Sequence, residues 1–84
     1  MKKQKLLRKA LESPANMRFS EIVALVEAFE FRLARTSGSH HIYVHPNVRE
    51  LVNLQKVQGM AKPYQIRQFL RLVERYNLEI GADS

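Results

Sequence analysis

The stretch FRLARTSGSHHIYVHP, residues 31 to 46, decides the fold, because two alternating segments flank a single break. In FRLART successive side chains point to opposite faces of an extended chain, which is typical of a strand. Ser37-Gly38 then interrupts the pattern as a tight turn does. HHIYVH is the return strand, and Pro46-Asn47 ends it. The stretch therefore predicts a β-hairpin.

Two amphipathic helices and a third strand surround this hairpin. Residues 20 to 30, SEIVALVEAFE, carry an apolar stripe at helical spacing, with Ser20 as the expected N-cap. Residues 51 to 55, LVNLQ, predict a third strand, and Pro63 opens a second helix over YQIRQFLRLVERY, residues 64 to 76. The order α-β-β-β-α predicts an α+β fold, with a three-stranded antiparallel sheet and the helices packed on one face. The other face is expected to be open.

An additional basic helix precedes this core. Residues 3 to 12, KQKLLRKALE, predict a short amphipathic helix with Leu7, Ala10 and Leu11 on its apolar side. We expect residues 1–84 to form a single domain, in which 1–14 are an addition to a core at 19–78.

Composition limits the classes of partner. The net charge is +6, and the first nine residues hold five of the 14 basic residues with no acid, so the excess charge lies mainly in the first helix. Such a charge favours nucleic acid as partner, although a solvated helix face explains it equally well. The absence of cysteine, and of any apolar run near 18 residues, predicts a cytoplasmic protein without a membrane partner.

The three histidines do not have the spacing of a metal site. Adjacent strand residues point to opposite faces, so His40 and His41 cannot share an ion, and His41 and His45 are roughly 13 Å apart along a strand. No Asp or Glu lies between residues 31 and 49 to complete a site. We therefore expect neither a metal nor another cofactor.

A single histidine can act instead as a general acid or base. The chain has no cysteine nucleophile, and Ser37 and Ser39 lack the strand-to-helix elbow of a hydrolase. RNA needs no nucleophile from the protein, because its own 2′-hydroxyl can attack the phosphate. Gly38 would let a phosphate approach the backbone. These features favour a ribonuclease, although a Gly-Ser-His turn also arises by chance.

Strand alternation leaves two registers open for this histidine. It places His40, Ile42 and Val44 on one face and Tyr43 on the other. Either Ile42 and Val44 are buried, with His40 at the edge of the core, or Tyr43 is buried and the other three form an exposed patch. An exposed apolar patch usually marks the landing site of a partner.

These residues resemble the HicA family of bacterial toxins over roughly residues 19 to 78. The resemblance rests on Gly38-Ser39-His40, Tyr43, His45-Pro46 and Lys62-Pro63. HicA proteins are small, metal-independent mRNA interferases with a double-stranded-RNA-binding-domain-like fold, neutralised by a HicB antitoxin. The basic first helix and the longer connection at residues 55–65 depart from the family pattern.

The resemblance implies roles for individual residues. His40 matches the catalytic histidine, and Gly38 and Ser39 match the turn beside it. Tyr43 matches a packing aromatic, which favours the register with His40 on the open face. His41 receives no role. Further expected roles are phosphate contacts for Arg35, Lys62 and Arg67, and antitoxin binding for Ile42 and Val44.

Two other functions share the same pattern. A non-catalytic RNA-binding module could use this fold, because fold alone does not determine activity. A winged-helix DNA binder would need residues 20–29 as its recognition helix, and that helix lacks basic and amide side chains to read base edges. We therefore disfavour the DNA binder.

Overall fold

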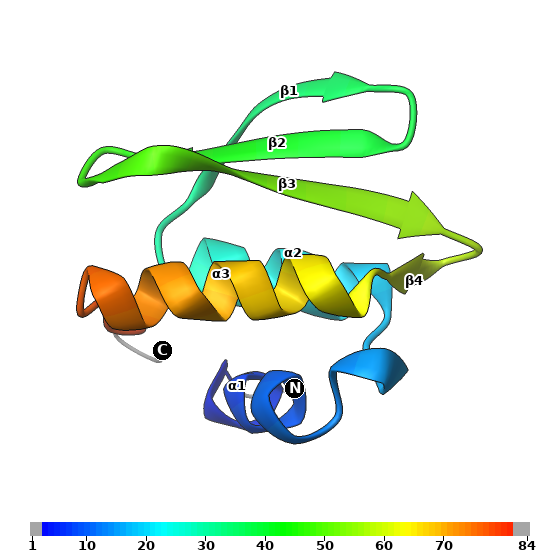
Figure 1. Cartoon of the computed structure of the whole chain (residues 1–84), viewed down its shortest axis with the longest axis horizontal. Helices are drawn as coiled ribbons and strands as arrows, with labels where there is room; N and C mark the ends of the chain where they lie inside the picture. The colour runs from blue at the N-terminus through cyan, green and yellow to red at the C-terminus, as the bar shows by residue number, and fades with distance from the viewer. Residues whose placement is uncertain (1–2, 82–84) are drawn as a thin grey trace.

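The predicted hairpin is present, within an antiparallel sheet of four strands in the order β1-β2-β3-β4 (Figure 1). The computed structural model describes residues 3–81. Its elements are α1 (Lys3–Glu12), a 3-10 turn (Pro14–Asn16), α2 (Phe19–Ala28), β1 (Arg32–Ser37), β2 (His40–His45), β3 (Val48–Val57), β4 (Met60–Ala61) and α3 (Pro63–Arg75). The α+β class and the order of the helices and first three strands are as predicted.

The expectation of a three-stranded sheet was wrong, because the long connection after the third strand forms a further hairpin, between β3 and β4. Strand β3 runs from Val48 to Val57 rather than over 51 to 55, and β4 pairs back on it through Val57 and Met60. Gln58 and Gly59 make the turn with φ of 51° and 79°. Two consecutive positive φ values are characteristic of a tight hairpin turn. The sequence signal for this turn was weak, since glutamine is not a usual residue at the first of the two turn positions.

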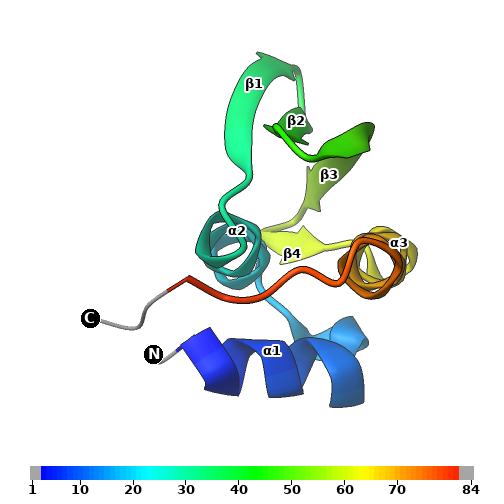
Figure 2. The same cartoon turned by 90° about the vertical axis from the view of Figure 1, so that its left-hand side faces the viewer.

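The layers explain why one sheet face stays open. Helices α2 and α3 lie side by side under the sheet, and α1 crosses beneath them on the side away from the strands (Figures 1 and 2). One apolar cluster connects all three helices with the strands, and its side chains with no exposed surface include Met17, Ile22, Leu25, Leu54 and Ile66. None of the helices covers the opposite face of the sheet (Figure 2).

The structure selects the second of the two registers. Tyr43 is buried on the side of the sheet that faces the helices, with 3% of its surface exposed, whereas Ile42 and Val44 are only partly buried. Burial raises the pKa of the Tyr43 phenol, and the nearby Glu27 carboxylate adds to the effect. The aromatic ring thus takes the core position that the aliphatic residues would otherwise hold, and His40 lies on the face without helices.

Helix α1 has the predicted bounds but a different orientation. Leu6 and Ala10 are its buried residues, whereas Leu11, expected on the apolar side, is 63% exposed. Since α1 contacts both α2 and α3, its buried stripe is centred on Leu6 and Ala10, one turn apart.

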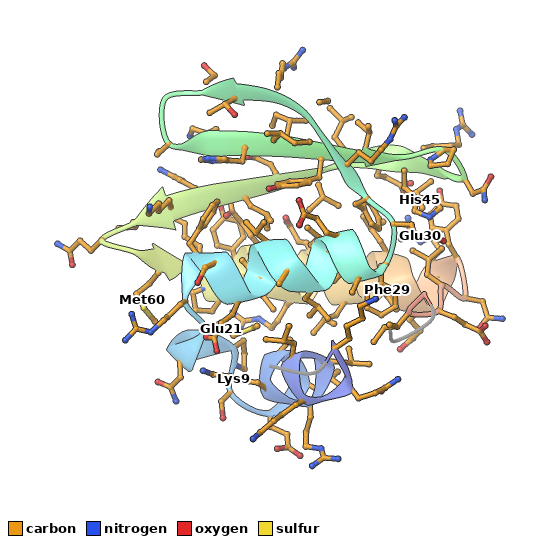
Figure 3. All side chains as sticks on the ribbon, turned by 180° about the vertical axis from the view of Figure 1, so that it is seen from behind. Lys9, Glu21, Phe29, Glu30, His45 and Met60 are labelled. Carbon is orange, nitrogen blue, oxygen red and sulfur yellow. The ribbon has the colours of Figure 1, made fainter. Side chains whose placement is uncertain are left out.

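An ion pair holds α1 against the start of α2. The Lys9 ammonium lies 2.9 Å from the Glu21 carboxylate, and Figure 3 shows the two side chains meeting between the helices. The same carboxylate accepts a hydrogen bond from the Arg18 N–H at 2.8 Å. Arg18 is therefore the N-cap residue, and the expectation of Ser20 was wrong, because Glu21 supplies the cap from within the first turn. The Arg18 N–H and then Lys9 lower the pKa of Glu21.

We predict that Glu21→Gln lowers the free energy of unfolding at pH 7 by about 1 kcal/mol. A lowered pKa stabilises the folded chain above the ordinary value of 4.5, and this stabilisation is lost as the pH falls through the folded-state pKa. Urea unfolding at pH 7 and pH 3 measures the difference. Glu12→Gln, on the exposed end of α1, is the control. A deficit of equal size at both pH values would contradict this role of the charge.

Candidate functional site on the open face of the sheet

The open face around His40 is basic and polar. Directly paired residues of antiparallel strands share a face, so Ser37 on β1 and Gln55 on β3 flank His40. Arg35 pairs with Ile42 in the same way. Strands β1 and β2 contain no Asp or Glu. The face therefore suits a polyanion.

The one carboxylate of β3 is directed toward α3. Glu50 accepts hydrogen bonds from the Arg75 guanidinium at 2.6 Å and the Tyr76 hydroxyl at 2.5 Å. The Tyr76 hydroxyl is the main cause of the lowered pKa of Glu50, and the same bond raises the pKa of Tyr76. The negative charge is thus neutralised at the end of α3, and it does not oppose an anion on the open face.

The turn that precedes His40 is exposed and requires glycine. Gly38 has φ +58°, and no atom lies within 4 Å of the place where a Cβ would stand. Backbone strain, rather than crowding, would therefore oppose another residue there. Ser39 is exposed, and its carbonyl accepts the N–H of Lys56 at 3.1 Å. This bond ties the turn to β3. It uses the Ser39 carbonyl and not the hydroxyl of the same residue, which directly precedes His40 in the chain.

Asn53 is a neighbour of His40 that sequence reasoning missed. Its Oδ1 lies 3.2 Å from Nδ1 of His40. The side chain projects between the buried Val52 and Leu54, so alternation already indicated that it faces away from the core. Its proximity to His40 depends on the pairing of β2 with β3, in which Gln55 lies opposite His40. That register was not readable from the sequence.

The other two histidines face the helices and pack on aromatic rings. The His41 ring lies 4.8 Å from the Phe19 ring, and the His45 ring lies 5.0 Å from that of Phe31. His45 is labelled near the end of the sheet in Figure 3. Both rings also bond to the local backbone: Nδ1 of His41 to the Ser39 carbonyl, and Nδ1 of His45 to the Asn47 N–H. These contacts give both residues a role in packing.

The three basic residues expected to bind phosphate lie in different places. Arg35 is exposed on β1 and shares the face of His40. Lys62 lies at the N-cap of α3, with its ammonium 5.9 Å from the centre of the Tyr64 ring. Arg67 lines a groove between α1 and α3, on the side of the helices away from the sheet. Of the three, the structure therefore brings only Arg35 to the face of His40.

A buried glutamine anchors β3 at the level of His40. Gln65, in the first turn of α3, is 3% exposed, and its Oε1 accepts the Gln55 N–H at 2.7 Å. Its amide nitrogen donates to the Tyr64 hydroxyl at 3.3 Å. Gln55 is paired with His40, so this bond fixes the strand segment opposite the histidine.

We predict that Gln65→Leu lowers the free energy of unfolding by about 1–3 kcal/mol, because the Gln55 N–H loses its acceptor, the oxygen of the buried Gln65 side chain. Thermal and urea unfolding measure the loss. The control is Gln68→Leu on the exposed side of the same helix, which should stay within about 0.5 kcal/mol of wild type. Equal stability of the two variants would show that the bond contributes nothing.

Within residues 3–81 there is no group of three or more His, Asp or Glu side chains placed to hold a metal ion. In the same part of the chain, no helix is long and apolar enough to cross a bilayer.

Comparison with known proteins indicates the family of the chain. Residues 19–74 match the model of a family described as the HicA toxin of bacterial toxin-antitoxin systems. The match begins at α2 and ends within α3, so it contains the whole sheet and leaves out α1. No curated protein and no solved structure matches the chain significantly.

Proposed function

Because the chain belongs to the HicA toxin family of bacterial toxin–antitoxin systems, we propose that it is an endoribonuclease that cleaves mRNA in the cytoplasm. His40 acts as a general acid or base on the phosphodiester, without a metal. The observation that carries this proposal is the half-exposed His40 imidazole beside the Gly38-Ser39 turn, on a sheet face free of carboxylates from β1 and β2.

The chemistry requires little of the protein. RNA supplies the nucleophile as its 2′-hydroxyl, and a histidine side chain can exchange protons near neutral pH. Gly38 and Ser39 hold the scissile phosphate through backbone N–H groups and the serine hydroxyl, and Arg35 contributes positive charge on the same face. Lys62 and Arg67 contact phosphates of the RNA chain distant from the scissile one.

A HicB-like antitoxin neutralises the enzyme by covering this face. Ile42 and Val44 are only partly buried, and Leu51, which alternation along β3 directs to the same side, is 56% exposed. A partner seated on these three aliphatic side chains would exclude RNA from His40. Inhibition is then steric.

We predict that purified wild type cleaves RNA in the presence of EDTA, whereas His40→Ala loses about 10²–10⁴-fold in rate. Gel analysis of a defined mRNA measures cleavage, and growth after induction reports toxicity in bacteria. His41→Ala is the matched control, because its ring packs against Phe19 on the other face, so it should keep most of the activity.

The results separate the candidate functions. Equal cleavage by wild type and His40→Ala would refute the catalytic role proposed for His40. RNA binding without cleavage by wild type would instead identify a non-catalytic RNA-binding module, which the same basic face could serve. An inactive His41→Ala that remains folded would move the catalytic role to the neighbouring residue.

We predict that Ile42→Asp weakens binding to a HicB-like antitoxin by about 100-fold, because a charge enters the centre of the interface. Isothermal titration calorimetry measures the affinity. Leu33→Asp introduces the same charge at an exposed leucine of β1 whose pairing with Tyr43 places it on the other side of the sheet. Binding that survives Ile42→Asp but not Leu33→Asp would place the antitoxin elsewhere.

A further inference from the structure

We propose that Asn53 is the positioning residue of His40: it selects the imidazole tautomer in which Nδ1 carries the hydrogen and Nε2 is the atom that accepts a proton from the RNA. This inference rests on the proposed ribonuclease function, and it assigns both the reacting atom and the direction of proton transfer.

The strand around Asn53 is held by the core, and this fixes the contact between Asn53 and His40. Oδ1 of Asn53 lies 3.2 Å from Nδ1 of His40, and the bond crosses from β3 to β2 on the open face. Val52 and Leu54, on either side of Asn53, are 4% and 0% exposed, so the strand segment is held by the core. Two residues along the chain, the Gln55 N–H is bonded to Gln65.

The chemistry of the two groups determines where the hydrogen lies. An amide oxygen can only accept a hydrogen bond, so Nδ1 of His40 must donate it. A neutral imidazole carries one hydrogen, and Nε2 therefore keeps its lone pair. Among residues 3–81 the structure gives the His40 ring no hydrogen-bond partner other than Asn53. Nε2 is thus the nitrogen left to act as a base.

The three histidines of the chain provide an internal comparison. His41 bonds through Nδ1 to the Ser39 carbonyl, which is also only an acceptor, and so it shares the Nδ1–H tautomer. In His45, Nδ1 accepts the Asn47 N–H, which forces the hydrogen onto Nε2. Local backbone groups explain the tautomers of these two rings. Only the tautomer of His40 depends on a side chain from another strand.

This tautomer assigns His40 the role of general base in the first step. The 2′-hydroxyl gives its proton to Nε2, the 2′-oxygen bonds to phosphorus, and the bond from phosphorus to the 5′-oxygen breaks. Water protonates the departing 5′-oxygen, and the hydroxide left behind takes the proton from the imidazolium. The products are a 2′,3′-cyclic phosphate and a 5′-hydroxyl, with no water consumed.

A neutral amide suits this position better than the carboxylate that orients histidine in many enzymes. Both groups fix the tautomer, but a carboxylate would add a negative charge where the RNA phosphate must approach. Strands β1 and β2 carry no acid, and Glu50 of β3 is bonded to Arg75 and Tyr76. Asn53 orients His40 without adding a negative charge to this face.

The tautomers can be measured without RNA. In long-range ¹H–¹⁵N spectra of the full chain at a pH where the rings are neutral, we expect His40 and His41 as Nδ1–H tautomers and His45 as the Nε2–H tautomer. In Asn53→Ala the His40 signals should move toward the Nε2–H form, while those of His41 and His45 stay unchanged. In Asn53→Asp, which retains an acceptor oxygen, His40 should keep the wild-type tautomer.

The same variants should separate kcat from KM. We expect Asn53→Ala to lower kcat about tenfold with little change in KM, because a smaller fraction of His40 has a free Nε2. Asn53→Asp should largely preserve kcat but raise KM for RNA. Asn47→Ala, the same substitution in the exposed turn after β2, should cleave as wild type does. Circular dichroism confirms that each variant is folded.

Each possible failure has a different meaning. A wild type that leaves RNA intact would refute the proposed function, and with it the positioning role of Asn53 in that reaction. If wild type cleaves but Asn53→Ala keeps both its kcat and its His40 tautomer, the function stands and the role of Asn53 is refuted. If Asn53→Ala unfolds, Asn53→Asp decides: a folded variant with His40 in the Nε2–H form would overturn the proposal.

Discussion

The burial of Tyr43 is the constraint on which the rest of the structure depends. A strand has only two faces, and packing this ring in the core with residues of α2 and α3 assigns every other residue of β2 to one of them. His41 and His45 then face the helices, where they meet Phe19 and Phe31. His40 lies on the face that no helix covers. A slip of one residue would turn His40 toward the helices and bring His41 and His45 to the open face.

Hydrogen bonds from α3 and the residue after it hold β3 in place, in addition to the apolar core. The buried Gln65 side chain bonds to β3 at Gln55, and Arg75 and Tyr76 bond to Glu50 near the other end of the same strand. Strand β3 is therefore tied to one helix at two places. This matters for the site, because β3 carries Asn53 to His40.

Helix α1 extends the core of the family fold on the side away from the site. Leu6 and Ala10 are part of the main apolar cluster, and Lys9 pairs with Glu21 at the start of α2. The family match starts at residue 19, so the helix is an addition to the matched segment. Helix α1 lies on the opposite side of the molecule from β2, the strand that begins with His40 (Figure 1).

The sequence by itself determined the local elements, the class of fold and the family. The hairpin, the helices and the Gly-Ser-His turn depend on short-range patterns, and the resemblance to HicA toxins is confirmed by the match over residues 19–74. The roles of His40 and of the expected phosphate contacts remain proposals. Tertiary structure decided the fourth strand, the cap of α2, the face of His40, the distant place of Arg67 and the contact with Asn53. Those features depend on which residues of different strands and helices become neighbours, and packing of the whole core, rather than local sequence, selects those pairs.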